Sequence, residues 1–384
     1  MEYSDNKAER IKILHGDAYT VLKTLPDESV QCCITSPPYY LLRNYGIDGQ
    51  IGIEPLHDCL GWATGNNCGK CYICHLRQVF SEVKRVLRRD GTLWLNIGDS
   101  YAGSGKAGNN PEYQKQHTEF GKPSKHKERF GPSVKPTGGL KNKDLMGIPW
   151  RTALALQADG WWLRSDIIWN KRRVMPESVT DRPTKGHEYI FLLTKSAKYF
   201  YDYFAIREKA VCPAGSKGGK GSKKRSSTNG VNSRPQEYAI YDGYRNKRTV
   251  WDVLPQGFKE YHFATFPEEL IRPMILAGTS ERGRCANCGS PYVRKLEKTN
   301  DKIELPNGNL VEIPVTKTIG WEKTCKCDCS IIKPCIVLDP FNGSGTTGVV
   351  AIQHGVDYIG IEIKKEYIEM SEKRISKILG GKYE

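Results

Sequence analysis

The sequence contains no run of eighteen apolar residues, so no segment is long enough to cross a bilayer as a helix. Its first residues lack the basic, apolar and small-residue series of a secretion signal. Acidic residues are outnumbered by basic ones, since 43 Asp and Glu stand against 58 Lys and Arg and leave a formal net charge of +15. Such an excess favours a polyanionic partner. We therefore expect a cytoplasmic protein without a membrane contact.

Without a secretion signal, the thirteen cysteines favour metal binding over disulfides, and most of them fall into short clusters. The first candidate zinc site consists of Cys285, Cys288, Cys325 and Cys327, and the second of Cys59, Cys68, Cys71 and Cys74. The first set flanks residues 289–324, whose charged, hairpin-like pattern is typical of a zinc ribbon. Four thiolates would fill a structural Zn²⁺ site. Cys329 leaves the choice of ligands open, and unligated reduced thiols are the alternative.

Apolar periodicity alternates between strands and helices along the chain. It predicts strands at residues 11–14, 30–34, 91–97, 162–169, 188–193, 336–338 and 358–361, and helices at 18–25, 76–87, 148–158, 346–354 and 366–379. This alternation predicts an α/β fold with a parallel sheet. Residues 101–143 read as a long mobile loop, and 212–247 as a basic linker or a segment that orders on DNA. We expect Trp161, Trp162 and Trp169 to pack in the core.

A glycine-containing turn joins the strand at 336–338 to the following helix. The turn comprises Asp339, Pro340, Phe341, Asn342, Gly343, Ser344 and Gly345. Its glycines permit close backbone approach to a ligand, and Glu362 at the end of the next strand could accept hydrogen bonds from both ribose hydroxyls of a nucleoside. No lysine follows the last glycine, which disfavours ATP. A tight turn without a ligand is the alternative.

A second motif, Thr35-Ser36-Pro37-Pro38-Tyr39-Tyr40, follows the predicted strand at 30–34. Adjacent prolines cannot continue a strand ladder, so the chain must leave the sheet rigidly. A backbone carbonyl beside a hydroxyl offers two acceptors for an exocyclic amine, and an aromatic ring can stack on a flat base. Both motifs follow predicted parallel strands, so we expect them to meet at the ligand-binding edge of the sheet.

With these motifs, most of the chain resembles the amino-methyltransferases of DNA, in the permuted group where the Pro-Pro-Tyr motif precedes the cofactor motif. The resemblance includes residues 15–17, 35–39, 90–96, 182–184, 187–189, 262–267, 339–345 and Glu362. It implies a Rossmann-like fold that binds S-adenosylmethionine, here with zinc-binding insertions. It also implies base flipping in double-stranded DNA and a role in a restriction-modification system. A cognate restriction endonuclease and a second copy of the chain in a homodimer are possible partners.

The resemblance implies a role for each motif residue. Asp17 would contact the adenine of the cofactor, Glu362 the ribose, and the turn from Asp339 to Gly345 the methionine portion, with Phe341 packing beside it. Ser36, the Pro37 carbonyl and Tyr39 would hold the target amine, with Pro38 completing the motif. Arg182 and His187-Glu188 would support the wall of the site.

The same resemblance favours direct displacement, in which the amine attacks the sulfonium methyl group without a cysteine nucleophile. Pro334-Cys335 precedes the cofactor strand, so we reject it as the thiol of carbon-5 chemistry. Serine at the first motif position favours cytosine N4 over adenine N6. A zinc-stabilised DNA-binding protein without turnover, and methylation of RNA or of a protein amide, remain as alternatives.

Five segments follow from these assignments. Residues 1–207 would be the catalytic half, with a cysteine insertion at 59–75 and the loop at 101–143. Residues 208–250 would recognise the target, 251–281 would close over the cofactor, 282–330 would be zinc-ribbon-like, and 331–384 would bind S-adenosylmethionine.

Overall fold

The computed structural model describes residues 10–42, 47–54, 68–102, 140–174, 176–211, 242–255, 267–304, 308 and 310–380. The strands are β1 (Ile11–His15), β2 (Val30–Thr35), β3 (Leu87–Ile97), β4 (Trp162–Asn170), β5 (His187–Thr194), β6 (Glu208–Lys209), β7 (Tyr244–Arg245), β8 (Val250–Asp252), β9 (Arg284–Cys285), β10 (Tyr292–Glu304), β11 (Leu310–Lys323), β12 (Ile332–Lys333), β13 (Ile336–Asp339) and β14 (Asp357–Glu362). The helices are α1 (Ala18–Leu22), α3 (Tyr72–Val86), α5 (Ile148–Ala158), α6 (Glu268–Gly278), α7 (Thr346–Gln353) and α8 (Lys365–Ile378), and η3 (Phe204–Ile206) is a 3-10 turn. In these ranges, no helix has the length and apolar character needed to cross a membrane.

Eight strands form the central sheet, in the order β1-β14-β13-β2-β3-β5-β4-β8. The sheet is mixed, which corrects the prediction of a purely parallel one: β5 pairs antiparallel with both β3 and β4. Between β4 and β5 the described residues form no helix, so the chain returns directly beside β4 and must run against it. The other pairings of this sheet are parallel.

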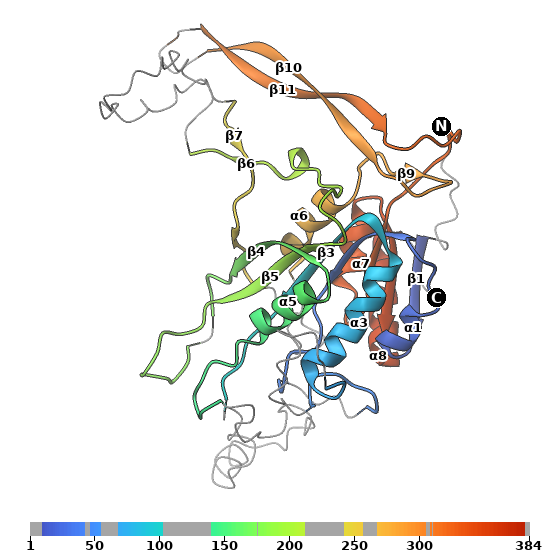
Figure 1. Cartoon of the computed structure of the whole chain (residues 1–384). Helices are drawn as coiled ribbons and strands as arrows, with labels where there is room; N and C mark the ends of the chain where they lie inside the picture. Colours follow the sequence, from blue (N-terminus) through green and yellow to red (C-terminus); the bar gives the residue numbers. More distant parts are fainter. Residues whose placement is uncertain are drawn as a thin grey trace, which may run out of the picture.

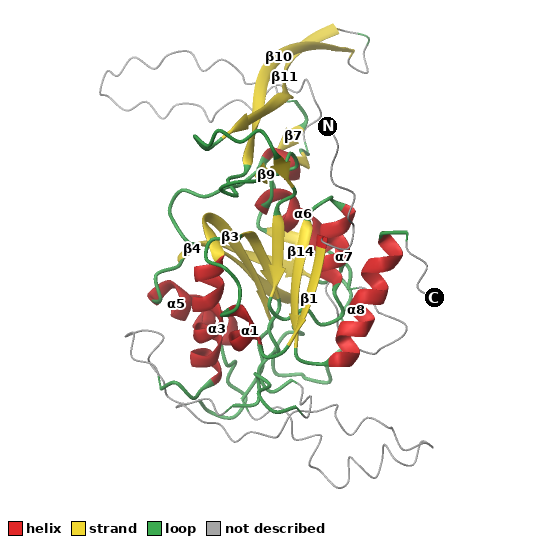
Figure 2. Cartoon of the chain, turned by 90° about the vertical axis from the view of Figure 1, so that its right-hand side faces the viewer, coloured by secondary structure: helices red, strands yellow, loops and turns green. Residues whose placement is uncertain are grey.

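Helices cover both faces of this sheet (Figure 2). Apolar residues of α3 and α5 pack with one face in one core, and those of α6 and α7 pack with the other face in a second core. The neighbouring cysteines of β2 divide between the cores, Cys33 on the first face and Cys32 on the second, as the alternation of a strand requires. Both are buried, in agreement with their expected packing role.

The predicted elements occur with small differences in length. The helix at 148–158 has the predicted bounds, whereas α3 begins four residues earlier than predicted because Tyr72 and Ile73 are also buried. Trp161 and Trp169 are buried, but Trp162 is 49% exposed, which corrects its assignment to the core. Within 251–281, β8 pairs with β4 and α6 packs on the sheet face, while residues 256–266 lie outside the described ranges.

The cysteine-flanked segment forms the predicted hairpin. β10 and β11 pair antiparallel along almost their whole length and project from the sheet as a long two-stranded ribbon (Figure 1). The short pair β9–β12 connects this ribbon to the body. The ribbon begins beside the amino ends of β2 and β3, since Gln31 donates to the Gly289 carbonyl (3.2 Å) and Arg88 to Ser290 Oγ (3.1 Å).

One buried carboxylate joins the two motifs at the opposite, carboxyl-terminal edge. β2 and β13 are neighbours, with Leu338 beside Cys33, so Thr35 and Asp339 both lie where their strands end. Asp339 Oδ1 accepts hydrogen bonds from Thr35 Oγ1 (2.6 Å) and Phe341 N (3.1 Å), and Oδ2 accepts one from Thr347 Oγ1 (2.8 Å). The expected meeting of the motifs is therefore confirmed.

The pKa of Asp339 leads to a testable prediction about how the free energy of unfolding depends on pH. Burial raises the pKa of Asp339 from 3.8 to about 6, against the lowering effect of the hydrogen bonds from Thr35 and Thr347. The folded state therefore holds this proton more tightly than the unfolded state. The resulting stabilisation is complete below pH 3.8 and is lost as the pH rises through about 6.

We expect Asp339→Asn to remove this pH dependence. Relative to the variant, the wild type should lose ~3 kcal/mol of unfolding free energy between pH 4 and pH 7, because a shift of about two pK units is worth that much. Urea unfolding at several pH values measures the difference. Asp166→Asn, at an exposed position of β4, is the matched control. Curves for wild type and Asp339→Asn that stay parallel across this range would contradict the prediction.

Candidate active site

A single cavity at the carboxyl-terminal edge of the sheet contains residues of both motifs. From the predicted catalytic and cofactor sets, its lining includes Ser36, Pro37, Pro38, Tyr39, Asp17, Asp339, Pro340, Phe341, Gly343, Ser344 and Glu362. Gly345 is the one predicted cofactor residue outside this lining. The structure thus brings together two motifs that lie some 300 residues apart in the chain.

The Ser-Pro-Pro segment leaves β2 in a fixed position. Pro37 is buried, and the Pro38 carbonyl accepts a hydrogen bond from the Tyr72 hydroxyl of α3 (2.8 Å). Among the described residues, none donates a hydrogen bond to the Pro37 carbonyl. Since Ser36 and Pro37 both line the cavity, a hydroxyl and a carbonyl are available side by side for an amine.

The ring of Tyr39 is held from two directions. Its hydroxyl lies 2.6 Å from Glu188 Oε2 and 2.9 Å from Asn96 Oδ1, and it shares its proton between these two acceptors. The ring packs on Gly98, where a Cβ atom would lie only 2.4 Å from Tyr39 Cε2. Burial, followed by the neighbouring Glu188 carboxylate, raises the pKa of Tyr39 well above its usual value. The phenol therefore stays protonated and keeps its hydrogen bonds.

The wall beside Tyr39 is charged. Glu188 on β5 forms an ion pair with Lys171, which follows β4, and both side chains line the cavity. Lys171 Nζ also lies 4.7 Å from the centroid of the Trp169 ring. Glu188 therefore supports the wall as predicted, whereas Arg182 pairs with Glu177 and does not line the cavity. No motif marks Lys171 in the sequence.

Two carboxylates lie in the other half of the cavity. Glu362, at the end of β14, accepts hydrogen bonds from Gly343 N (2.8 Å) and Lys364 N (2.9 Å). Asp17 caps α1 through its Oδ1, which accepts from Thr20 N (2.9 Å). Burial raises the pKa of Glu362, against the lowering effect of these backbone N–H groups. Each carboxylate oxygen can accept further hydrogen bonds, so both groups can still bind a nucleoside.

The two glycines of the turn have different roles. Gly343 lines the cavity, with a φ of 50°. Gly345 has a φ of 75° and packs against α8, where a Cβ atom would lie 2.5 Å from Ser371 Cβ. Gly345 therefore permits the approach of a helix, and its predicted contact with the cofactor stays a prediction.

Several residues of the cavity were not predicted from the sequence. They include Ala18, Leu42, Gly49, Gln50, Ile51, Thr346, Thr347, Ile361, Ile363, Lys364, Tyr367 and Met370. Position relative to a motif could have indicated some of them, since Ile363 and Lys364 directly follow Glu362. The residues around Ile51 and on α8 reach the cavity only through tertiary packing.

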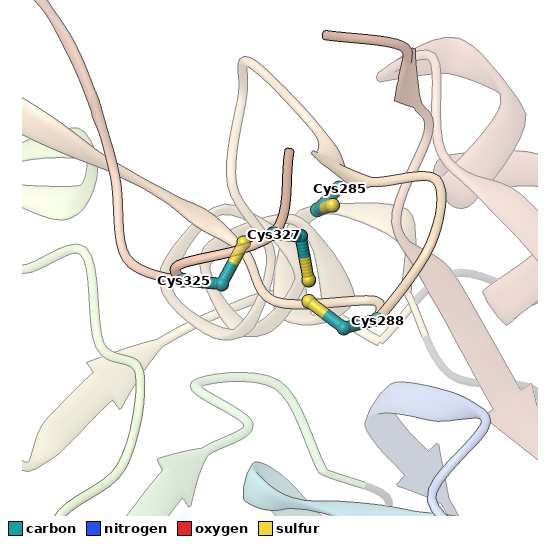
Figure 3. Close-up of side chains that lie close together, drawn as sticks. All are labelled: Cys285, Cys288, Cys325 and Cys327. Carbon is teal, nitrogen blue, oxygen red and sulfur yellow. The ribbon is translucent and has the colours of Figure 1, made fainter. Parts of the chain in front are cut away.

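The four cysteines of the first predicted metal site come together. The sulfur atoms of Cys285, Cys288, Cys325 and Cys327 all lie within 4.8 Å of one another, and Figure 3 shows them converging from two turns. The fifth cysteine, Cys329, places its sulfur 3.8 Å from the Ile331 carbonyl. In a tetrahedral zinc site with bonds of about 2.3 Å, sulfur atoms are about 3.8 Å apart, so small shifts would complete the geometry.

The second cysteine cluster is described in part. Cys68, Cys71 and Cys74 lie within 4.8 Å of one another at the start of α3, while Cys59 lies outside the described residues. His75 is not part of this cluster, because neither of its ring nitrogens is among the ligand atoms that lie within 4.8 Å of one another; its Nδ1 lies 2.7 Å from Glu54 Oε1. Three of the four predicted ligands therefore lie together.

Cys335 has no role in this cavity. It is buried at the amino end of β13, at the edge of the sheet opposite the cavity, and burial raises its pKa to about 12. A thiol with this pKa is protonated at neutral pH.

Comparison with known proteins identifies the family. A family model described as DNA methylase matches residues 30–286 and 328–373. The Type II methyltransferase M.Cfr9I of Citrobacter freundii is 40% identical over 365 residues, which cover 94% of this chain and 87% of that protein. M.SmaI of Serratia marcescens is 37% identical over 376 residues, which cover 97% of this chain and 94% of that protein.

A solved structure shows the same fold. The cytosine-N4-specific PvuII DNA methyltransferase is 15% identical, with a TM-score of 0.51 over 97% of this chain and 90% of that chain. The chain belongs to the N6/N4 family of DNA methyltransferases.

Proposed function

We propose that this protein transfers a methyl group from S-adenosylmethionine to the N4 amine of cytosine at a specific site in double-stranded DNA. The observation that carries the proposal is the single cavity that holds Ser36 and Tyr39 together with Glu362 and Gly343. A cofactor and a flipped base bound there would share one cavity.

The residues of one half of the cavity fit S-adenosylmethionine. Glu362 offers carboxylate oxygens for the ribose hydroxyls, and Asp17 offers an acceptor for the amine of the adenine. The turn with Gly343 and Ser344 leads into the amino end of α7, where the helix dipole favours an anionic group such as the carboxylate of the methionine portion. Bound there, the cofactor supplies an electrophilic methyl group on a sulfonium.

The other half positions the amine. Ser36 Oγ and the Pro37 carbonyl accept its two hydrogens, which leaves its lone pair directed away from them. The Tyr39 ring, fixed by Glu188, Asn96 and Gly98, stacks on the base. Orientation and proximity supply most of the rate acceleration, so no protein nucleophile is needed.

Cytosine N4 is preferred because a serine occupies the first position of the motif. M.Cfr9I and M.SmaI are Type II methyltransferases. By analogy, we propose that this protein belongs to a restriction-modification system and acts with a restriction endonuclease of the same sequence specificity. Residues 208–250 are proposed to read the target sequence, although 212–241 lie outside the described residues.

Mass spectrometry of nucleosides tests the reaction. Purified protein incubated with S-adenosylmethionine and unmethylated DNA of varied sequence should produce N4-methylcytosine. Ser36→Ala should slow the reaction by roughly 10²-fold, the scale for loss of one positioned hydrogen-bonding group in an active site. Ser330→Ala, at an exposed position outside the cavity lining, is the matched control.

The other outcomes separate the alternatives. N6-methyladenine would keep the mechanism and reverse the choice of base. DNA binding without a methylated base would instead support a zinc-stabilised DNA-binding protein.

A second prediction tests the position of Tyr39. We expect Gly98→Ala to displace the ring, because the added Cβ would lie 2.4 Å from Tyr39 Cε2. A displacement on the order of 1 Å should reduce kcat by about 10²-fold. Gly186→Ala is the control, since a Cβ there meets no atom within 4 Å. Steady-state kinetics with an unchanged melting temperature would attribute the loss to the ring, and a kcat equal to the wild-type value would contradict the assignment.

We also propose that Cys285, Cys288, Cys325 and Cys327 bind one structural Zn²⁺, and that Cys68, Cys71 and Cys74 bind a second one with Cys59. The four converging sulfur atoms of the first set support this assignment. Four thiolates leave no coordination position for water or substrate, so the metal would hold the β10–β11 ribbon on the body and take no part in methyl transfer.

Elemental analysis of the purified protein tests the metal. We expect one or two equivalents of zinc, and the double substitution Cys285→Ser and Cys288→Ser should remove one equivalent and lower the melting temperature, because metal binding contributes folding free energy. Cys329→Ser should change neither quantity. Protein that is free of metal, with a melting temperature unaffected by the double substitution, would show that these cysteines are unligated thiols.

A further inference from the structure

Helix α8 contacts the cofactor turn at two points one helical turn apart. The first is Ser371, which packs against Gly345 so closely that a Cβ atom at Gly345 would lie 2.5 Å from Ser371 Cβ. The second is Arg374. Nothing in the sequence indicates this second contact, because Arg374 lies on an amphipathic helix with no motif around it.

Arg374 binds three oxygen atoms of the turn and the helix that follows it. Its Nη1 lies 2.7 Å from the Ser344 carbonyl, 3.0 Å from Ser344 Oγ and 2.9 Å from Thr346 Oγ1. Ser344 and Thr346 both line the cavity, whereas Arg374 does not. The guanidinium therefore lies directly behind the cavity wall and acts through these two residues.

The position places two sources of positive potential together. α7 begins at Thr346 and has no acidic residue in its first turn, so its amino end carries the partial positive charge of the helix dipole. Arg374 adds a full charge beside it. Burial lowers the pKa of Arg374, while the Glu268 carboxylate acts in the opposite direction. A part-buried cation is screened less by water than an exposed one, so its field reaches further into the cavity.

This positive potential is complementary to the negatively charged part of the proposed cofactor. S-adenosylmethionine has a single carboxylate, on its methionine portion, and its sulfonium and ammonium groups are cationic. A positive wall at Ser344 would attract the carboxylate and repel the two cations, so it would define which end of the cofactor faces α7.

We propose that Arg374 is a positioning residue that selects the carboxylate of the cofactor's methionine portion, by holding Ser344 and Thr346 and by supplying the countercharge behind them. The inference rests on the proposed function, because it names the part of S-adenosylmethionine that this turn recognises.

Binding of two ligands to the full-length protein tests the inference. S-adenosylhomocysteine carries the carboxylate, and its decarboxylated analogue keeps the adenosine, the sulfur and the amine. Isothermal titration gives the preference of each variant for the first ligand over the second. Arg374→Gln retains a hydrogen-bond donor without the charge, whereas Arg374→Lys retains the charge.

We expect Arg374→Gln to reduce this preference about tenfold, the scale of one charge-assisted interaction. Arg374→Lys should keep most of it. Lys373→Gln, at an exposed position of the same helix, removes a positive charge away from the turn and should leave the preference unchanged.

The remaining outcomes overturn the proposal in distinguishable ways. An equal loss of affinity for both ligands in Arg374→Gln would show that Arg374 only supports the fold. A preference equal to the wild-type value in that variant would show that the carboxylate is recognised elsewhere. A wild-type protein that binds neither ligand would overturn the proposed cofactor itself.

Discussion

The active site depends on one buried carboxylate. Asp339 is 2% exposed and receives hydrogen bonds from Thr35, Thr347 and the backbone N–H of Phe341. Burying a carboxylate costs free energy, and these three hydrogen bonds offset part of that cost. In return, the residue before Ser36, the cofactor turn and the start of α7 are fixed to one another. The catalytic and cofactor halves of the cavity therefore keep a fixed separation, although they come from opposite ends of the chain.

Local pattern predicted the strands and helices well, because their apolar periodicity is decided within each segment. α5, for example, has the predicted bounds. Strand direction depends on how segments connect and pack. β5 runs antiparallel to β4 because it follows β4 without an intervening helix. The sequence of β5 itself does not indicate this direction. Likewise, Trp162 and Trp169 read alike in the sequence, yet only the latter is buried, because β8 and the Val253 carbonyl cover it.

The same distinction applies to the cavity. The motif residues were predictable because adjacent parallel strands place their carboxyl ends at one edge, so Ser36, Asp339 and Glu362 had to lie close together. Of the residues that hold them, Glu188 was expected in the wall of the site from the resemblance, whereas its hydrogen bond to Tyr39 and the contacts of Asn96 and Arg374 were not. Glu188 and Asn96 fix Tyr39 from β5 and β3, and Arg374 fixes Ser344 from α8, at sequence separations that only the tertiary fold brings together. Gly345 shows the converse: its place in the motif suggested a ligand, and its close contact with Ser371 supplies a packing reason for the glycine.

The cysteine module, the segment 282–330 that carries the four clustered cysteines, lies at the opposite end of β2 and β13 from the cavity. Gln31 illustrates the connection, since it donates to the Gly289 carbonyl and accepts from Ile336 N (2.7 Å), linking the module to β13 at its amino end. Asp339 ends that same strand. A strand of a packed sheet transmits position along its length because its register is fixed by its neighbours on both sides. Disorder in the module would therefore loosen the amino ends of β2 and β13 first, and would affect the cofactor turn only after their pairing had been lost. The proposed Zn²⁺ site would therefore stabilise the fold without contacting the cavity in which methyl transfer is proposed.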